Sequence, residues 1–166
     1  MNKRRILGGF CVATATTVAL VALLGARLMK PSIEGNYVLE SRELPDGRTI
    51  KPPQVMGMMS LTSDMRNFNV YWTEGTSPKQ LSTISRYTLS DTEYTETSMF
   101  YMDNNISGDG VTYRTAPETG KSSVTQKDGK WSFKLPLHGE PEVVFDGNGF
   151  TATQPGLFVD HWKKVQ

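Results

Sequence analysis

Turn signals recur at near-regular spacing along the chain after Ile33, and this punctuation restricts the fold more than any other feature of the sequence. Gly accepts a positive φ angle and Pro fixes its own φ angle, and both favour turns. Short stretches rich in Gly, Pro, Asn and Asp therefore mark the ends of strands. Asp128-Gly129 is the strongest of these signals, because Asp-Gly favours the two-residue turn of a β-hairpin. Between the turns, apolar and polar residues alternate, as they do in a strand with one solvated face.

These boundaries predict an all-β fold of about ten short strands, with no helical stripe after Ile33. Sequential hairpins favour an antiparallel meander, and a long meander removes its exposed edges by closing on itself. We therefore expect an antiparallel up-and-down β-barrel of about eight to ten strands. A Greek-key sandwich is the alternative, because hairpin spacing does not separate the two. The expected strands span residues 36–44, 56–62, 68–73, 82–89, 93–101, 111–115, 122–126, 130–135, 143–145, 150–153 and 157–164.

An apolar leader precedes the predicted domain. After the basic residues Lys3, Arg4 and Arg5, the chain runs from Ile6 to Ala26 without a charge, which is about the length that crosses a bilayer as a helix. The basic flank is expected to stay in the cytoplasm. We therefore predict a signal anchor or transmembrane helix with a short spacer at 1–32, and a barrel at 33–166 on the non-cytoplasmic side of the membrane. Cleavage near Ala26 is the alternative and would give a secreted or periplasmic domain.

Charge and cysteine content exclude several function classes. The net charge is +1 without a basic stripe, so no nucleic-acid partner is expected. Cys11, the only cysteine, lies in the leader, which excludes a disulfide or a cysteine-ligated metal in the domain. His138 and His161 are the only histidines, too few for a metal site on their own, and both are expected in solvent.

The sequence does not predict a catalytic site either. No Gly-x-Ser-x-Gly elbow and no phosphate loop is present, so the sequence indicates no enzyme and no cofactor. A hydrolase or isomerase at the barrel mouth would need His138 or a carboxylate pair to converge on a pocket with shifted pKa values. The pairs that the sequence offers are Glu93 with Glu96 and Glu140 with Glu142.

Short motifs in the predicted barrel resemble a known family. Residues 35–41 (GNYVLES), Asp46-Gly47, residues 57–62 (GMMSLT) and a last strand ending at Trp162 look like the lipocalin-like domains of the calycin group. The chain departs from the lipocalin pattern where Gly35-x-Tyr37 replaces Gly-x-Trp. The resemblance implies a barrel with a central cup for small hydrophobic molecules. It also implies a basic residue near Tyr37, which is Lys163 or Lys164.

We interpret the domain as an exported or membrane-tethered lipocalin-like barrel that binds a small hydrophobic or amphipathic molecule without chemistry. Side chains on one face of each strand would point into the barrel, and tyrosines would orient a polar end of the ligand. The alternative is a solid-core β-domain that serves as a protein interaction module of the cell envelope, recognisable by an exposed apolar patch and no cavity. The predicted ligand-binding residues are Met58, Phe68, Val70, Trp72, Tyr87, Met99, Tyr101, Trp131 and Phe133.

Overall fold

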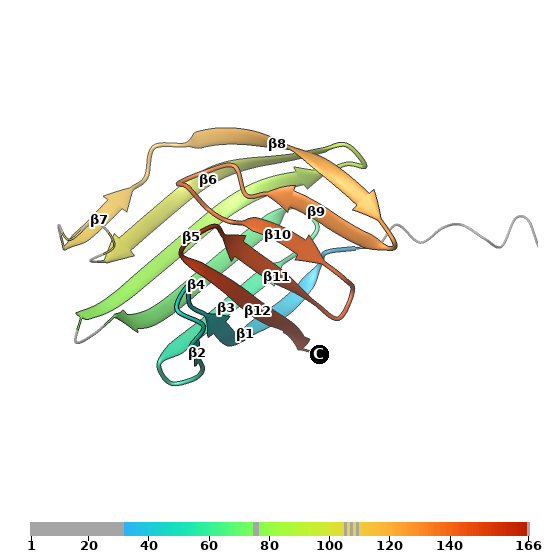
Figure 1. Cartoon of the computed structure of the whole chain (residues 1–166). Helices are drawn as coiled ribbons and strands as arrows, with labels where there is room; N and C mark the ends of the chain where they lie inside the picture. The colour runs from blue at the N-terminus through green and yellow to red at the C-terminus, as the bar shows by residue number, and fades with distance from the viewer. Residues whose placement is uncertain (1–31, 75–76, 105, 107, 109, 166) are drawn as a thin grey trace, which may run out of the picture. The chain divides into compact units, whose positions relative to one another are not determined.

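A computed structural model describes residues 32–74, 77–104, 106, 108 and 110–165 of the chain, so the predicted leader lies outside the described residues. The described part contains twelve strands and no helix (Figure 1). The strands are β1 (Gly35–Glu43), β2 (Thr49–Ile50), β3 (Val55–Leu61), β4 (Met65–Glu74), β5 (Ser77–Leu89), β6 (Glu93–Asn104), β7 (Val111–Arg114), β8 (Glu118–Lys127), β9 (Lys130–Lys134), β10 (Glu142–Phe145), β11 (Gly149–Gln154) and β12 (Phe158–Val165).

The strands form one closed antiparallel barrel. Each strand pairs with its neighbours in the order β12-β11-β10-β9-β8-β6-β5-β4-β3-β1, and β12 pairs with β1 to close the ring. The short strands β2 and β7 pair only with β1 and β6, outside this ring, which leaves ten strands in the barrel. The expected all-β up-and-down barrel is confirmed. The sequence pattern missed β2, which is only two residues long.

Local sequence explains where the strands turn. Asp128 and Gly129 both have positive φ, 52° and 76°, in the tight connection between β8 and β9 that the Asp-Gly signal predicts. The connection between β3 and β4 is shorter than expected, because Met65 and Arg66 already belong to β4. β5 and β6 are longer than the sequence indicated and form the most extensive hairpin, paired from Gln80 to Leu89.

Two β-bulges change which side chains face the interior. In β1, Leu39 pairs with Trp162 and Ser41 with His161, so Glu40 is an extra residue. In β6, Ser98 and Phe100 pair with the adjacent β5 residues Ser85 and Ile84, which makes Met99 an extra residue. Because side chains alternate across a strand, one extra residue moves every later inward position by one.

The core fills the barrel end at which β1 begins. Ile33 is buried across this end and accepts a hydrogen bond through its carbonyl from the Tyr37 hydroxyl at 2.7 Å. The Tyr37 ring packs edge-on against Phe145 and Phe150, with centroids 5.8 and 5.2 Å away. Lys164, the register partner of Tyr37, places its Nζ 5.8 Å from the centre of this ring.

The geometry around Tyr37 shows which of two lysines, Lys163 or Lys164, lies near the tyrosine ring. Lys164 lies over the ring, whereas Lys163 lies 3.6 Å from Glu40 on the exposed face. A side chain at Gly35 would overlap the Lys164 stem, so glycine leaves room for this lysine. Of the two lysines, Lys164 is therefore the one that lies near the Tyr37 ring.

The described residues include no helix long and apolar enough to cross a bilayer.

Candidate functional site: a cavity at the barrel mouth

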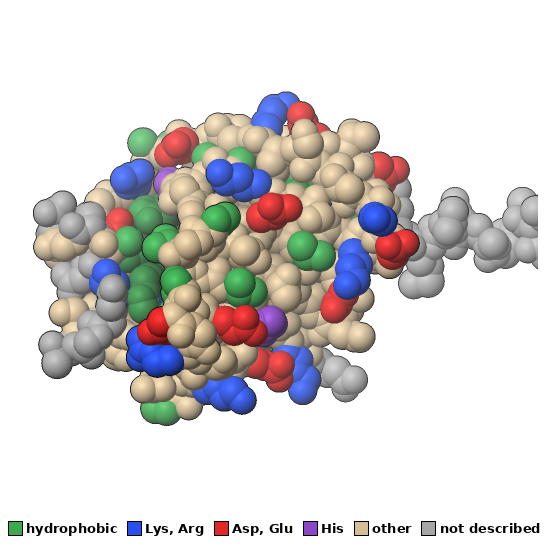
Figure 2. All heavy atoms as spheres, in the orientation of Figure 1, with side chains coloured by type: hydrophobic (Ala, Val, Ile, Leu, Met, Phe, Trp, Pro, Cys, Tyr) green, Lys and Arg blue, Asp and Glu red, His purple; other side chains and the backbone are tan. Residues whose placement is uncertain are grey.

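The opposite end of the barrel holds a cavity of about 220 Å³. It lies where β4 ends, β5 begins and β11 turns into β12, and Figure 2 shows hydrophobic side chains gathered in a hollow at this end, on the left of the view. Leu157 and Ile106 line the cavity and are exposed, so the rim is apolar as well. Pockets for drug-sized ligands usually measure roughly 300–1,000 Å³, so this one fits a small molecule or one part of a longer one.

Four of the nine predicted ligand-binding residues line this cavity. Phe68, Val70 and Trp72 alternate along β4, and Tyr101 comes from β6. Other strands complete the wall with Met59, Leu81, Phe150, Ala152, Phe158 and Trp162. The period-two pattern found β4 correctly, because no bulge interrupts this strand.

The other five predicted residues do not line the cavity. Met58 is half exposed on the outer face of β3, and its neighbour Met59 takes the inward position. Met99 is the bulge residue of β6, which makes Tyr101 rather than Met99 a wall residue. The remaining three belong to the buried hydrophobic core: Tyr87, Trp131 and Phe133. The rings of Tyr87 and Phe133 both stack on Tyr94.

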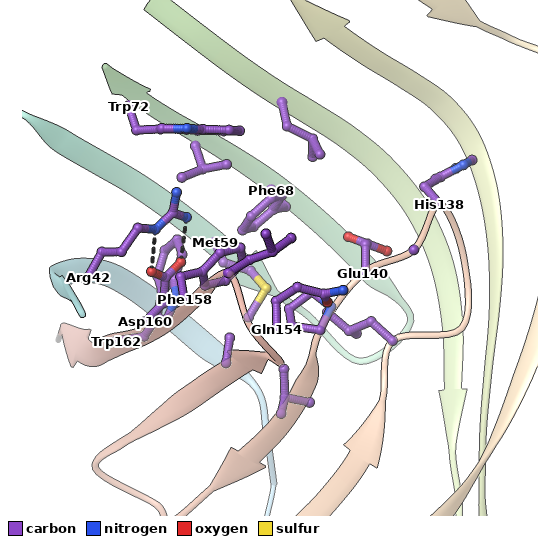
Figure 3. A pocket seen from close by; sticks show the side chains of 18 of the residues that line it. Arg42, Met59, Phe68, Trp72, His138, Glu140, Gln154, Phe158, Asp160 and Trp162 are labelled. Atoms are coloured by element: carbon purple, nitrogen blue, oxygen red, sulfur yellow. Dashed lines mark hydrogen bonds and ion pairs between the residues drawn. The ribbon is translucent and has the colours of Figure 1, made fainter. Parts of the chain in front are cut away.

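A buried ion pair stands in the cavity wall near the mouth. Arg42 on β1 and Asp160 on β12 are register partners, and the guanidinium binds the carboxylate in a fork, with Nε to Oδ1 at 2.6 Å and Nη2 to Oδ2 at 2.8 Å. Both side chains are about 95 % buried. The guanidinium carbon also lies 4.9 Å from the Trp72 ring centre and 4.1 Å from that of Phe158 (Figure 3). Two aromatic rings and one carboxylate therefore fix its position.

A second charged cluster lies beneath the cavity floor. Arg66 on β4 donates from Nη1 to Glu96 at 2.6 Å, and its Nη1 and Nη2 both contact the carboxylate of Glu140. All three side chains are at least 95 % buried. Tyr94 donates a further hydrogen bond to Glu96 at 2.9 Å. One buried guanidinium thus holds two carboxylates, and Glu140 forms part of the cavity lining.

The two carboxylates of this cluster differ in pKa. For Glu96, burial raises the pKa, but Arg66 and the hydrogen bonds from Ser85 and Tyr94 outweigh burial and lower it. For Glu140, burial and the negative charge of Glu96 both raise the pKa. Arg66 lowers it but does not fully offset them, so the pKa is raised. Burial also raises the pKa of Asp160 above its ordinary value despite the Arg42 fork.

The connection between β9 and β10 folds into the barrel and contributes to the cavity through His138 and Glu140. Pro136 and Leu137 of this loop pack on Gly120 of β8, where any side chain would collide with them. The expectation that His138 is solvated is wrong: its side chain is 3 % exposed and its ring lies 4.0 Å from that of Tyr101. Burial lowers the pKa of His138, and the Glu118 carboxylate opposes this shift from 3.8 Å. His161, in contrast, lies on the outer face as expected, with Nε2 2.9 Å from Glu43.

Sequence reasoning missed the charged residues of the site, although part of the signal was present. Asp160 alternates with Phe158 and Trp162, and Arg66 alternates with Phe68 and Val70, so each lies on the apolar face of its strand. A charge on such a face indicates a buried partner, because an unpaired buried charge is costly. No such signal was present for Arg42. Plain alternation after Leu39 would point residue 42 outward, and the bulge at Glu40 turns it inward.

Within the described ranges, no group of three or more His, Cys, Asp or Glu side chains is arranged to hold a metal ion. Comparisons of the chain with protein-family models, with curated proteins and with solved structures returned no match. The fold and site therefore rest on the geometry of this chain alone.

Proposed function

We propose that the barrel binds a small hydrophobic or amphipathic molecule non-covalently in the cavity at its mouth. The observation that carries the proposal is the cavity itself: a solid-core domain would fill this end with side chains, whereas here aromatic and aliphatic walls surround about 220 Å³ of open space. Burying an apolar ligand there removes its surface from water, at about 25 cal/mol per Å². We further propose that the leader exports or tethers the domain, as its sequence predicts.

Filling the cavity tests this function. Leu81→Trp adds an indole in the cavity wall, and we expect it to lower affinity for the neutral fluorescent probe N-phenyl-1-naphthylamine at least tenfold, about 1.4 kcal/mol. The matched control is Met58→Trp, which adds the same ring on the outer face of β3. Native mass spectrometry of protein purified from its own host identifies any retained molecule. Equal probe binding by the wild type and Leu81→Trp would contradict the proposal.

Chemistry at the mouth is less well supported, although His138 and Glu140 both line the cavity with shifted pKa values. Both oxygens of Glu140 contact Arg66, so this carboxylate is occupied as an ion-pair partner and is not available as a base. No serine or threonine lines the cavity in the part of the chain that the structure describes. We therefore propose binding without a reaction.

One observation favours a second candidate function, an interaction module. Three neighbouring rows of outward positions on β3, β4, β5, β6 and β7 carry no charged side chain, and several of these residues are exposed and apolar. Tyr113 is 66 % exposed. We call this surface the uncharged face. It comprises Met56, Tyr71, Gln80, Asn104 and Val111 in one row, Met58, Asn69, Ser82, Met102 and Tyr113 in the next, and Ser60, Asn67, Ile84 and Phe100 in the third.

A second copy of the chain is the simplest partner for the uncharged face, because two such faces meet without like-charge repulsion. We expect sedimentation equilibrium to show a dimer that Met58→Lys converts to a monomer, because a lysine in this face would be buried without a counter-charge. The control is Thr125→Lys, an exposed position on β8 away from the face. A wild-type protein that stays monomeric up to its solubility limit would contradict self-association.

A further inference from the structure

The polar groups around the cavity are not equally satisfied, and the difference indicates which head group a ligand carries. Asp160 has both carboxylate oxygens bound by Arg42, and Glu140 has both oxygens in contact with Arg66. The two carboxylates in the wall are therefore occupied. A cationic head group would have to compete with a guanidinium for either carboxylate.

Arg42, in contrast, has donors to spare. A guanidinium carries five N–H groups, and the fork to Asp160 uses one on Nε and one on Nη2. Among the described residues, no acceptor is hydrogen-bonded to Nη1 or to the second N–H of Nη2. Figure 3 shows this side of the guanidinium directed away from Asp160, toward Trp72 and the cavity. This edge of Arg42 is thus free to bind an acceptor from outside the protein.

Arg66 is the other buried guanidinium of this interior, and it binds through Nη1 and Nη2 while its Nε has no hydrogen-bond partner among the described residues. It holds two carboxylates, those of Glu96 and Glu140. Arg42 is buried to a similar degree but holds only one, Asp160, and the place of a second carboxylate is open to the cavity. Charge-assisted bonds from a guanidinium are the strong class of hydrogen bond, so a carboxylate is the group that best completes the site.

We propose that the cavity ligand is an amphipathic acid whose carboxylate binds the free edge of Arg42 while its apolar part packs against Phe68, Val70 and Leu81. This inference rests on the proposed binding function and names the ligand class for the same site. Trp72 and Phe158 hold the guanidinium between them, so the site is formed before the ligand arrives.

The test compares three molecules with the same ten-carbon tail: decanoate, decanol and decylammonium. Each displaces N-phenyl-1-naphthylamine from the full-length protein at pH 7.5. We expect decanoate to bind at least tenfold more tightly than decanol, and decylammonium to bind more weakly than both. Preference for the amine, or equal affinity of the acid and the alcohol, overturns the acidic head group and leaves the binding function standing. Failure of the probe and of all three molecules to bind overturns both.

Two variants locate the preference at Arg42. Arg42→Met alone would leave Asp160 buried without a partner, so the informative variant is the double change Arg42→Met/Asp160→Leu, which replaces the ion pair with apolar side chains. It should bind decanol as the wild type does and lose the tenfold preference for decanoate. The control is Arg48→Met/Asp46→Leu, which removes an exposed ion pair of 2.7 Å from the turn after β1 and should keep the preference. A double variant at Arg42 that still prefers decanoate overturns the proposal.

Discussion

At the scale of single residues, His138 brings a titratable ring into an apolar setting. Its backbone has positive φ, 53°, and its two ring nitrogens have no hydrogen-bond partner among the described residues. Burial favours the neutral ring, so the folded state has the lower pKa. The unfolded chain then binds the proton more readily, and the His138 contribution to stability is lost as pH falls through its ordinary value of about 6.5.

Because the pKa of His138 is lower in the folded state, stability is predicted to fall as the pH falls. We expect the free energy of unfolding to fall more steeply between pH 7.5 and 5.5 in the wild type than in His138→Asn, because asparagine accepts the positive φ but has no proton to gain. Urea titrations at several pH values measure the difference. The matched comparison is His161→Asn, which makes the same change at a histidine on the outer face. Parallel curves for His138→Asn and the wild type would show that burial of the imidazole has no cost.

The groups that face His138 act in both directions. Glu118 and Glu96 favour the charged ring, whereas Arg114 and Arg66 oppose it. Glu140 and Asp160 have raised pKa values, so their ionisation removes stability as pH rises above their ordinary values near 4. These carboxylates are present in both proteins, and the comparison of His138→Asn with the wild type therefore reports mainly on the histidine.

At the scale of the strand, a glycine on β3 makes room for the cavity floor. A side chain at Gly57 would overlap the Trp162 ring and crowd Leu39. Trp162 stacks on its β11 register partner Phe150 with centroids 5.2 Å apart and lines the cavity. Gly57 thus leaves the space into which the Trp162 ring extends.

Gly57→Ala is therefore expected to destabilise the barrel by about 1–3 kcal/mol through overpacking. It should also weaken probe binding, because a displaced Trp162 moves into the cavity. Urea unfolding followed by tryptophan fluorescence gives the first quantity, and probe titration gives the second. Met58→Ala, at the neighbouring outward position, should change stability by no more than about 0.5 kcal/mol. A Gly57→Ala protein as stable as the wild type would mean that Trp162 has room to move.

The two bulges explain which side chains could be predicted from the sequence. On β4, uninterrupted alternation assigned Phe68, Val70 and Trp72 to the inward face correctly, and this face lines the cavity. On β1, the extra residue Glu40 turns Arg42 inward, where plain alternation after Leu39 would point it outward. A bulge depends on pairing with a distant strand, and the period of one strand holds no information about it.

At the scale of the whole molecule, the turn signals predicted sequential antiparallel strands, because short connections make neighbours of consecutive strands. Hairpin spacing did not separate a barrel from a Greek-key sandwich, and the pairing of β12 with β1 shows the barrel. The turn signals were not sufficient for the cavity either. Trp131 and Phe133 have the same alternation as the β4 residues, yet they fill the solid end of the barrel and not the hollow one. The depth of a residue along the barrel axis depends on strand tilt and register, which only the assembled sheet defines.

The first and the last strand bring both ends of the described chain to the same end of the barrel. Ile33 and Val165 both lie at the filled end, since Asn36 pairs with Val165 and the Tyr37 hydroxyl binds the Ile33 carbonyl. The cavity opens at the other end, beside Leu157. A sensor surface or a fluorescent protein joined to the N-terminal or the C-terminal residue of the domain therefore leaves the opening of the cavity unobstructed. Under the proposed function, a ligand would enter the barrel from the end opposite Ile33 and Val165, so binding would have a fixed direction relative to both ends of the described chain.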